Sequence, residues 1–220
     1  MGMKRGTLAV CVLAAVLASS FAGTRARADE SGGAQPQVAT ILRRLADNPA
    51  APQQYSADVK LHVRLRIFPW ISVTLKGSEA YKHPGLYHFV FRGVPKAAEH
   101  FSDMAWSLGD PAAWSEKYEV ALLQPAAGGK ATLRLTPKMS GLVKSLDVTV
   151  DLASGRLDRA VWSRTDGGTI AVTQHYQTVE ARDVVAEQHA SIRIPHMAAD
   201  LVATYSNFSL AKTVASADRP

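Results

Sequence analysis

The sequence predicts an α+β protein built on a curved antiparallel β-sheet, and three observations support this. Apolar and polar residues alternate without exception from Tyr55 to Ile67, and only a β-strand has a side-chain period of two. Later apolar runs are separated by turns rich in Gly, Asp and Pro, which is typical of antiparallel hairpins. Two other segments have helical spacing. We therefore expect about nine or ten strands and two helices in one domain, with one apolar face on the sheet.

The first 28 residues have the features of an export signal. Lys4 and Arg5 precede an apolar stretch from Leu8 to Ala18, and Ala26-Arg27-Ala28 is a small-x-small cleavage site. The apolar stretch is too short to span a bilayer as a permanent helix. The sequence therefore predicts Sec-dependent export to the periplasm, a flexible leader over 29–36, one domain over 37–212 and a disordered tail over 213–220.

Removal of this signal changes the charge balance. The signal contains four of the 25 basic residues and no acidic one, so the mature chain keeps 21 basic and 19 acidic residues. Such a balance gives little support for nucleic-acid binding. The single cysteine, Cys11, lies in the signal, which excludes a disulfide or a cysteine-bound metal in the mature protein.

Two segments have helical periodicity. Gln37–Ala46 places its apolar residues on one helical face and ends before Asn48-Pro49. Pro95–Leu108 does the same, with proline at a favourable first position and Gly109-Asp110-Pro111 after its end. We expect both helices to cover the sheet.

The strands follow from alternation and from the turns between them. Gly77 interrupts the second strand and indicates a bulge or bend. The expected strands are Tyr55–Ile67, Ile71–Lys82, Leu86–Phe91, Tyr118–Leu123, Ala131–Thr136, Leu146–Leu152, Arg156–Arg164, Thr169–Gln177, Ser191–Ile194 and Ala203–Phe208.

Two stretches carry a recognisable pattern, Lys82–Phe89 and Leu135–Lys138, the second followed by Asp151–Leu157. They resemble the LolA-type periplasmic carrier of outer-membrane lipoproteins and its wider superfamily. The first is similar to the family's Lys-Arg-Pro-x-x-Phe segment. The second is similar to its Leu-Thr-Pro-Lys, and Asp151–Leu157 is similar to its Asp-x-x-x-Gly-x-Ile hairpin. The resemblance implies an unclosed barrel around an apolar cavity, with helices as a lid, that holds the acyl chains of a client.

The sequence departs from that family at its functional arginine and phenylalanine. His83 and Tyr87 stand at these positions. Histidine cannot copy a permanently charged guanidinium, so His83 is a candidate handover residue for a different partner. This favours a LolA-like carrier with another lipidic client over the dedicated lipoprotein shuttle.

The predicted lipid site is the apolar face of the first three strands together with the second helix. Alternation alone does not distinguish a ligand-holding interior from a filled core, so both remain open. The expected lipid-binding residues are Val59, Leu61, Val63, Leu65, Val73, Leu75, Tyr87, Phe89, Phe91, Phe101 and Met104.

The turn after the first strand is unusually apolar for a hairpin tip. Phe68 and Trp70 lie there, close to Arg64 and Arg66. Aromatic residues beside cations are typical of contacts with membrane surfaces. We expect Phe68 and Trp70 to touch a bilayer.

The sequence contains no catalytic motif, and its seven histidines lack the spacing of metal ligands. We therefore expect a monomer without enzymatic activity, metal or cofactor. It would carry a lipid or an acylated lipoprotein between membrane donor and acceptor proteins. The alternatives are an adaptor like RseB, which senses lipoproteins or protein partners, and a structural envelope module with a filled core.

Overall fold

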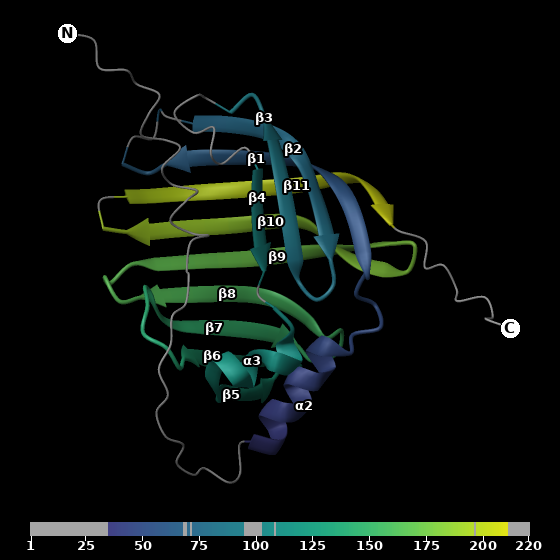
Figure 1. Ribbon diagram of the computed structural model, residues 1–220, viewed down its shortest axis with the longest axis vertical. Coiled ribbons are helices and arrows are strands. Elements are labelled where there is room, and N and C mark those ends of the chain that lie inside the picture. Colours follow the sequence, from purple (N-terminus) through teal and green to yellow (C-terminus); the bar gives the residue numbers. More distant parts are fainter. Residues whose placement is uncertain are drawn as a thin grey trace, which may run out of the picture.

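The computed structural model describes residues 35–67, 70, 72–94, 103–107, 109–195 and 197–210. Eleven strands in this part form one sheet in the order β4-β3-β2-β1-β11-β10-β9-β8-β7-β6-β5 (Figure 1). The two outer strands, β4 and β5, do not pair with each other, so the sheet is unclosed. This confirms the expected α+β fold with an open antiparallel barrel. The predicted export signal, leader and tail lie outside the described residues, apart from the start of the first helix.

The element boundaries agree closely with the periodicity of the sequence at most positions. The helices are α2 (Gln35–Ala46), the 3-10 turn η2 (Pro111–Ala113) and α3 (Trp114–Lys117). The strands are β1 (Gln54–Leu65), β2 (Ser72–Lys82), β3 (Leu86–Arg92), β4 (Asp103–Ser107), β5 (Tyr118–Ala127), β6 (Lys130–Pro137), β7 (Val143–Asp151), β8 (Arg156–Arg164), β9 (Thr169–Val179), β10 (Arg182–Ile194) and β11 (Met197–Leu210).

Strand β1 lies at a central position of the sheet, between β2 and β11. Every second side chain from Tyr55 to Leu65 is buried, and those between are exposed. The alternation read from the sequence is therefore a true inside-outside pattern. Because the two faces differ so strongly, a slip of one residue would expose six buried side chains, and this fixes the register.

Gly77 does not form the bulge that its position in β2 indicated. It pairs in regular register with Val59 on β1 and Phe91 on β3. A Cβ atom at position 77 would lie 2.2 Å from the Val90 carbonyl oxygen and 3.0 Å from the Phe91 ring. The glycine instead allows β3 to approach β2 closely, with the ring of Phe91 over it.

The apolar interior is divided into two clusters. One packs Val38, Ile41, Leu42 and Leu45 of α2, with Trp114, against the inner faces of β6, β7 and β8. The other, here called the aromatic half, joins β1, β2 and β3 to β9, β10 and β11. Figure 1 shows α2 beside the β5–β7 end of the sheet, while β2, β3 and β4 curl over in front of the other strands. The helix therefore covers only one half of the inner face.

The second predicted helix, Pro95–Leu108, is wrong over the residues that the structure describes. Asp103–Ser107 forms β4, which pairs antiparallel with β3 and places Trp106 opposite Tyr87. A strand here satisfies backbone groups along β3 that a helix would leave unpaired. Beyond it, Asp110 begins η2 by accepting a 2.8 Å hydrogen bond from the Ala112 backbone amide. The remainder of the predicted helix, 95–102 and Leu108, lies outside the described residues.

Candidate functional site

The structure gathers most of the predicted lipid-binding side chains in the aromatic half. Val59, Leu61, Val63, Leu65, Leu75 and Phe91 are buried there, and Val73, Tyr87 and Phe89 pack against them. Phe101 lies outside the described residues, as does the side chain of Met104, whose backbone belongs to β4. The common location agrees with the predicted site, while lipid binding by these residues stays a prediction.

A continuous row of aromatic rings begins on β1, crosses β2 and runs along β3. The ring centroids of Tyr55 and Tyr81 are 5.0 Å apart, as are those of Tyr81 and Tyr87. Tyr87 to Phe89 and Phe89 to Phe91 follow at 6.4 and 6.1 Å. These are ordinary distances for favourable ring contacts. These five rings form one side of the aromatic half, and we call them the aromatic wall.

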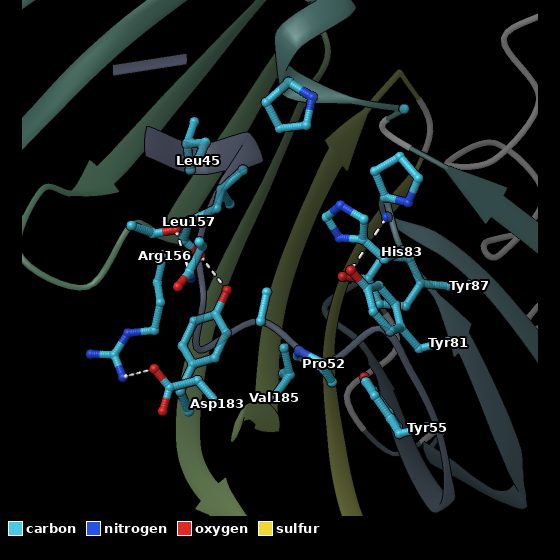
Figure 2. Close-up of a pocket in the computed structure, with 18 of the residues that line it drawn as sticks. Leu45, Pro52, Tyr55, Tyr81, His83, Tyr87, Arg156, Leu157, Asp183 and Val185 are labelled. Atoms are coloured by element: carbon cyan, nitrogen blue, oxygen red, sulfur yellow. Dashed lines mark hydrogen bonds and ion pairs between the residues drawn. The ribbon is translucent and has the colours of Figure 1, made fainter. Parts of the chain in front are cut away.

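A pocket of about 130 Å³ opens where the two halves of the interior meet. Figure 2 shows Tyr55, Tyr81, His83 and Tyr87 along one side, across from Leu45, Leu157, Arg156 and Asp183. Pro52 and Val185 lie between the two sides. The walls come from the end of α2, the β2–β3 turn, η2 and the β7–β8 turn.

The size of this pocket limits what it holds in this conformation. An engineered apolar cavity of about 150 Å³ binds one benzene molecule, so the pocket has room for one group of about that size. A long acyl chain needs several times that volume. The aromatic wall must therefore move away from β9 and β10, or α2 from the sheet, before a chain can enter.

The end of α2 is tied to two turns of the sheet. The Asn48 side-chain amide donates to the Gly155 carbonyl oxygen at 3.1 Å, and the Asp183 backbone amide donates to the Ala50 carbonyl oxygen at 2.8 Å. Gly155 has a φ of +64°, and a Cβ there would lie 2.9 Å from the Arg44 carbonyl oxygen. Movement of α2 would therefore pivot about this end.

The polar wall of the pocket centres on Arg156. Its guanidinium lies 5.1 Å above the Tyr176 ring and 3.5 Å from the Asp183 carboxylate. Asp151 lies farther away, at 4.0 Å. Arg156 Nε and, across the pocket, His83 Nδ1 are buried with no hydrogen-bond partner among the described residues. Both nitrogens are therefore unpaired hydrogen-bonding groups of residues that line the pocket.

Glu79 is the buried acid of the inner face. It is 2% exposed, and its carboxylate accepts a 2.7 Å hydrogen bond from the Tyr55 hydroxyl. Burial raises the pKa of Glu79 from 4.5 to about 7, although hydrogen bonds from Tyr55 and Tyr205 partly oppose this shift. Burial also raises the pKa of Tyr55. The aromatic half therefore encloses a carboxyl group that titrates near neutrality.

The predicted membrane contacts lie at the turn between β1 and β2. Trp70 is 77% exposed and Ile67 is 53% exposed, which is unusual for large apolar side chains. Phe68 lies outside the described residues. Arg66 beside them forms a two-pronged ion pair with Asp200, at 2.6 Å through both nitrogens.

Two further features concern membranes and metals. Among the described residues no helix is long and apolar enough to cross a bilayer. No three histidine or carboxylate side chains in that part of the chain gather in a way that could hold a metal ion.

Of the residues that line the pocket, the sequence singled out Tyr87 as a lipid-binding residue and His83 as a handover candidate, and it gave no indication of most of the others. The inward orientation of Glu79 was predictable from the sequence. The alternation of β2 through Val73, Leu75 and Gly77 continues to Glu79 and places its side chain on the inner face. Trp114, Arg156 and Tyr176 carry no such signal. They reach the pocket only through the order of the strands, which the sequence does not reveal.

No family model matches the sequence, and no curated protein matches it. Solved structures are nevertheless similar in fold. A DUF1329 family protein from Desulfovibrio piger aligns with a TM-score of 0.58 at 11% identity, covering 82% of this chain and 94% of its own. A putative outer membrane lipoprotein-sorting protein domain from Vibrio parahaemolyticus gives 0.56 at 9% identity, with coverages of 82% and 93%.

A LolA superfamily protein from Nitrosomonas europaea aligns with a TM-score of 0.52 at 11% identity, covering 79% of this chain and 93% of its own. At such identities the likeness concerns the fold alone. The resemblance read from Lys82–Phe89 and Leu135–Lys138 thus agrees with the three-dimensional comparison. The chain has the fold of the LolA superfamily, an unclosed antiparallel barrel with a helix against its inner face.

Proposed function

We propose that this protein is a periplasmic carrier that shields the acyl chains of a lipid or an acylated lipoprotein. One observation carries the proposal. The inner face of the unclosed sheet is mostly apolar, while α2 covers only the half formed by β5 to β8. The other half is closed by its own aromatic wall, which borders a pocket open to solvent.

The free energy of apolar burial favours replacing the contacts of the aromatic wall with contacts to a ligand. Each methylene moved from water into an apolar site contributes about 0.8 kcal/mol. When a chain enters, the rings of Tyr87, Phe89 and Phe91 exchange contacts with β9–β11 for contacts with the chain, so little apolar surface meets water. An acyl chain can therefore supply the binding energy without any covalent step, and we propose no enzymatic activity.

The location and partners follow from the sequence. The signal over 1–28 directs the chain to the periplasm, where it would meet donor and acceptor proteins of both membranes. His83 lines the pocket, and a handover partner would contact it there. The histidine in place of a guanidinium supports a lipidic client other than that of the dedicated lipoprotein shuttle.

A pair of substitutions on opposite faces of β3 tests the proposal. Phe89 faces the interior and packs in the aromatic half, whereas its neighbour Val90 is 38% exposed on the outer face. Phe89→Arg places a charge where the chain would lie and should abolish uptake of a fluorescent acyl lipid from vesicles. Val90→Arg is the matched control and should take up lipid like the unaltered protein.

The outcomes separate the alternatives. Equal uptake by both variants removes β3 from the site. Failure of the unaltered protein to take up lipid contradicts the carrier function. In that case, specific capture of a protein partner would favour an RseB-like adaptor, and no capture would favour a structural module.

A further inference from the structure

The inner face carries a row of polar side chains that a purely hydrocarbon ligand would not need. The row consists of Tyr55, Glu79, Tyr205, Gln188, Gln174 and Tyr176. It crosses β2, β1, β11, β10 and β9 on the apolar side of the sheet. Polar groups at such positions weaken an apolar core unless each one has a partner.

Gln174 and Gln188 form the centre of this row. They are directly opposite each other on β9 and β10. Gln174 is four residues from buried Ile170, and Gln188 is four residues from buried Ile192, so both side chains lie on the inner face. Gln174 is only 9% exposed.

Each amide lies against the hydroxyl group of a neighbouring tyrosine. The Tyr176 hydroxyl is 2.7 Å from the Gln174 side-chain amide and 2.9 Å from the Leu157 carbonyl oxygen. The Tyr205 hydroxyl is 2.9 Å from the Gln188 side-chain amide and also bonds Glu79. Each hydroxyl has one proton, so a tyrosine that donates to Leu157 or Glu79 accepts an N–H from its glutamine. Because a side-chain amide has two N–H groups, each glutamine keeps at least one of them for a ligand, and the pair offers these donors side by side.

The position of this pair relative to the pocket defines a path. Tyr176 and Val185, which are paired on β9 and β10, line the pocket. Gln174 lies two residues beyond Tyr176 along β9, or about 7 Å deeper. Beyond it the face is apolar, with Val172 and Ile170 on β9 and Ile192 on β10. A ligand entering from the pocket would meet the amides first and the apolar surface second.

The chemistry of the strands around the pair restricts what it binds. The inner faces of β9, β10 and β11 carry no basic residue, so a phosphate or free carboxylate at this depth would be buried without a counter-charge. A neutral acceptor has no such cost. The carbonyl oxygens of ester and amide linkages are neutral acceptors, and they lie between the head group and the chains of acylated molecules.

We propose that Gln174 and Gln188 bind the ester or amide carbonyls that join acyl chains to the head group of the ligand. This inference rests on the carrier function proposed above and defines its substrate class. The charged head group then remains at the pocket mouth, near Arg156, and the chains run along β9 and β10. The pair sets how deep the ligand enters.

Two lipids that differ only in these carbonyls test the inference. A diacyl phospholipid with ester linkages is compared with its dialkyl ether analogue of the same chain length and head group. One neutral hydrogen bond corresponds to about a 2- to 10-fold change in affinity, so the unaltered protein should prefer the ester lipid by roughly that factor or more. Binding of the ether lipid measures the apolar site alone.

The variants identify the residues responsible. Gln174→Leu/Gln188→Leu should bind both lipids equally and keep its affinity for the ether lipid. Gln177→Leu makes the same change at an exposed position of β9 and should retain the preference. The preference for the ester lipid is measured on the unaltered protein, so the inference is testable even if the double variant fails to fold.

Equal binding of ester and ether lipids by the unaltered protein would overturn the inference and leave the carrier function standing. Retention of the full preference in the folded double variant would also overturn it. Binding of neither lipid by the unaltered protein would instead contradict the proposed function itself.

Discussion

The Tyr55 hydroxyl donates a 2.7 Å hydrogen bond to the Glu79 carboxyl group, joining β1 to β2 inside the aromatic half. Burial, together with the nearby charge of Glu79, raises the pKa of each tyrosine around it, namely Tyr55, Tyr81, Tyr87 and Tyr205. These neighbours stay neutral across the physiological range. The proton of Glu79 is therefore the one that changes within this polar cluster between pH 5 and 8.

Stability should fall as pH rises from about 4.5 to 7. The native pKa of Glu79, about 7, lies above its ordinary value of 4.5, so the folded state binds the proton more tightly than the unfolded state. Its favourable contribution is complete below pH 4.5 and is lost as pH rises through 7. The shift corresponds to about 3 kcal/mol in the free energy of unfolding. Urea denaturation at several pH values measures it.

Glu79→Gln should remove this pH dependence and make the protein more stable than the unaltered chain at pH 8. The matched control is Glu119→Gln, at an exposed position on the edge strand β5. An unchanged slope in Glu79→Gln would show that the carboxyl group is not buried in solution. Asp166 and Asp200, whose pKa values are lowered by Arg164 and Arg66, act below pH 4 and in the opposite sense.

Gly77→Ala should destabilise the protein by roughly 3 kcal/mol, at the upper end of ordinary overpacking. The new Cβ would lie 2.2 Å from the Val90 carbonyl oxygen, so β2 and β3 must separate. Gly141→Ala is the control, because no atom lies within 4 Å of its Cβ position. Thermal unfolding compares the two, and similar midpoints would contradict the close approach of β3 to β2.

Asn48→Ala should loosen the end of α2. It removes the bond to the Gly155 carbonyl oxygen and the bond from the Ala50 backbone amide to the Asn48 side chain, at a cost of about 1–2 kcal/mol. Backbone hydrogen exchange should accelerate in α2, and acyl chains should enter faster. Gln53→Ala, at an exposed position in the same linker, should change neither rate. Unaltered exchange in Asn48→Ala would mean that α2 does not pivot there.

Trp70→Ser should weaken binding to vesicles while leaving the fold intact. The side chain is 77% exposed, so its loss creates no cavity. Leu142→Ser changes another exposed apolar residue, in the β6–β7 turn, and should not alter vesicle binding. Sedimentation with anionic vesicles measures both. Equal binding by the two variants and the unaltered chain would exclude the β1–β2 turn as the membrane contact.

The fold was predictable where one side of an element is apolar and the other polar. β1 and α2 both meet this condition, and their inward residues are buried as expected. β10 does not: Val184 and Val185 are adjacent, and the register shifts between Val185 and Glu187. This bulge breaks the alternation, which explains why only its last residues, Ser191–Ile194, read as a strand.

β4 shows the opposite failure. Its residues belong to an apolar pattern at helical spacing, yet the free edge of β3 imposes a strand on Asp103–Ser107. The periodicity of a segment depends on its own residues alone, so it contains no information about a neighbouring strand with an unpaired edge. The same limit applies to the pocket. Arg156 and Asp183 are 27 residues apart, and only the order of β8, β9 and β10 brings them together.

The most direct test of the carrier function is native mass spectrometry of the mature protein, purified from an envelope fraction without detergent. The account predicts a discrete added mass that extracts into organic solvent as an acylated molecule, and that is absent from Phe89→Arg. A protein that carries no added mass, and gains none after incubation with lipid vesicles, would contradict the account.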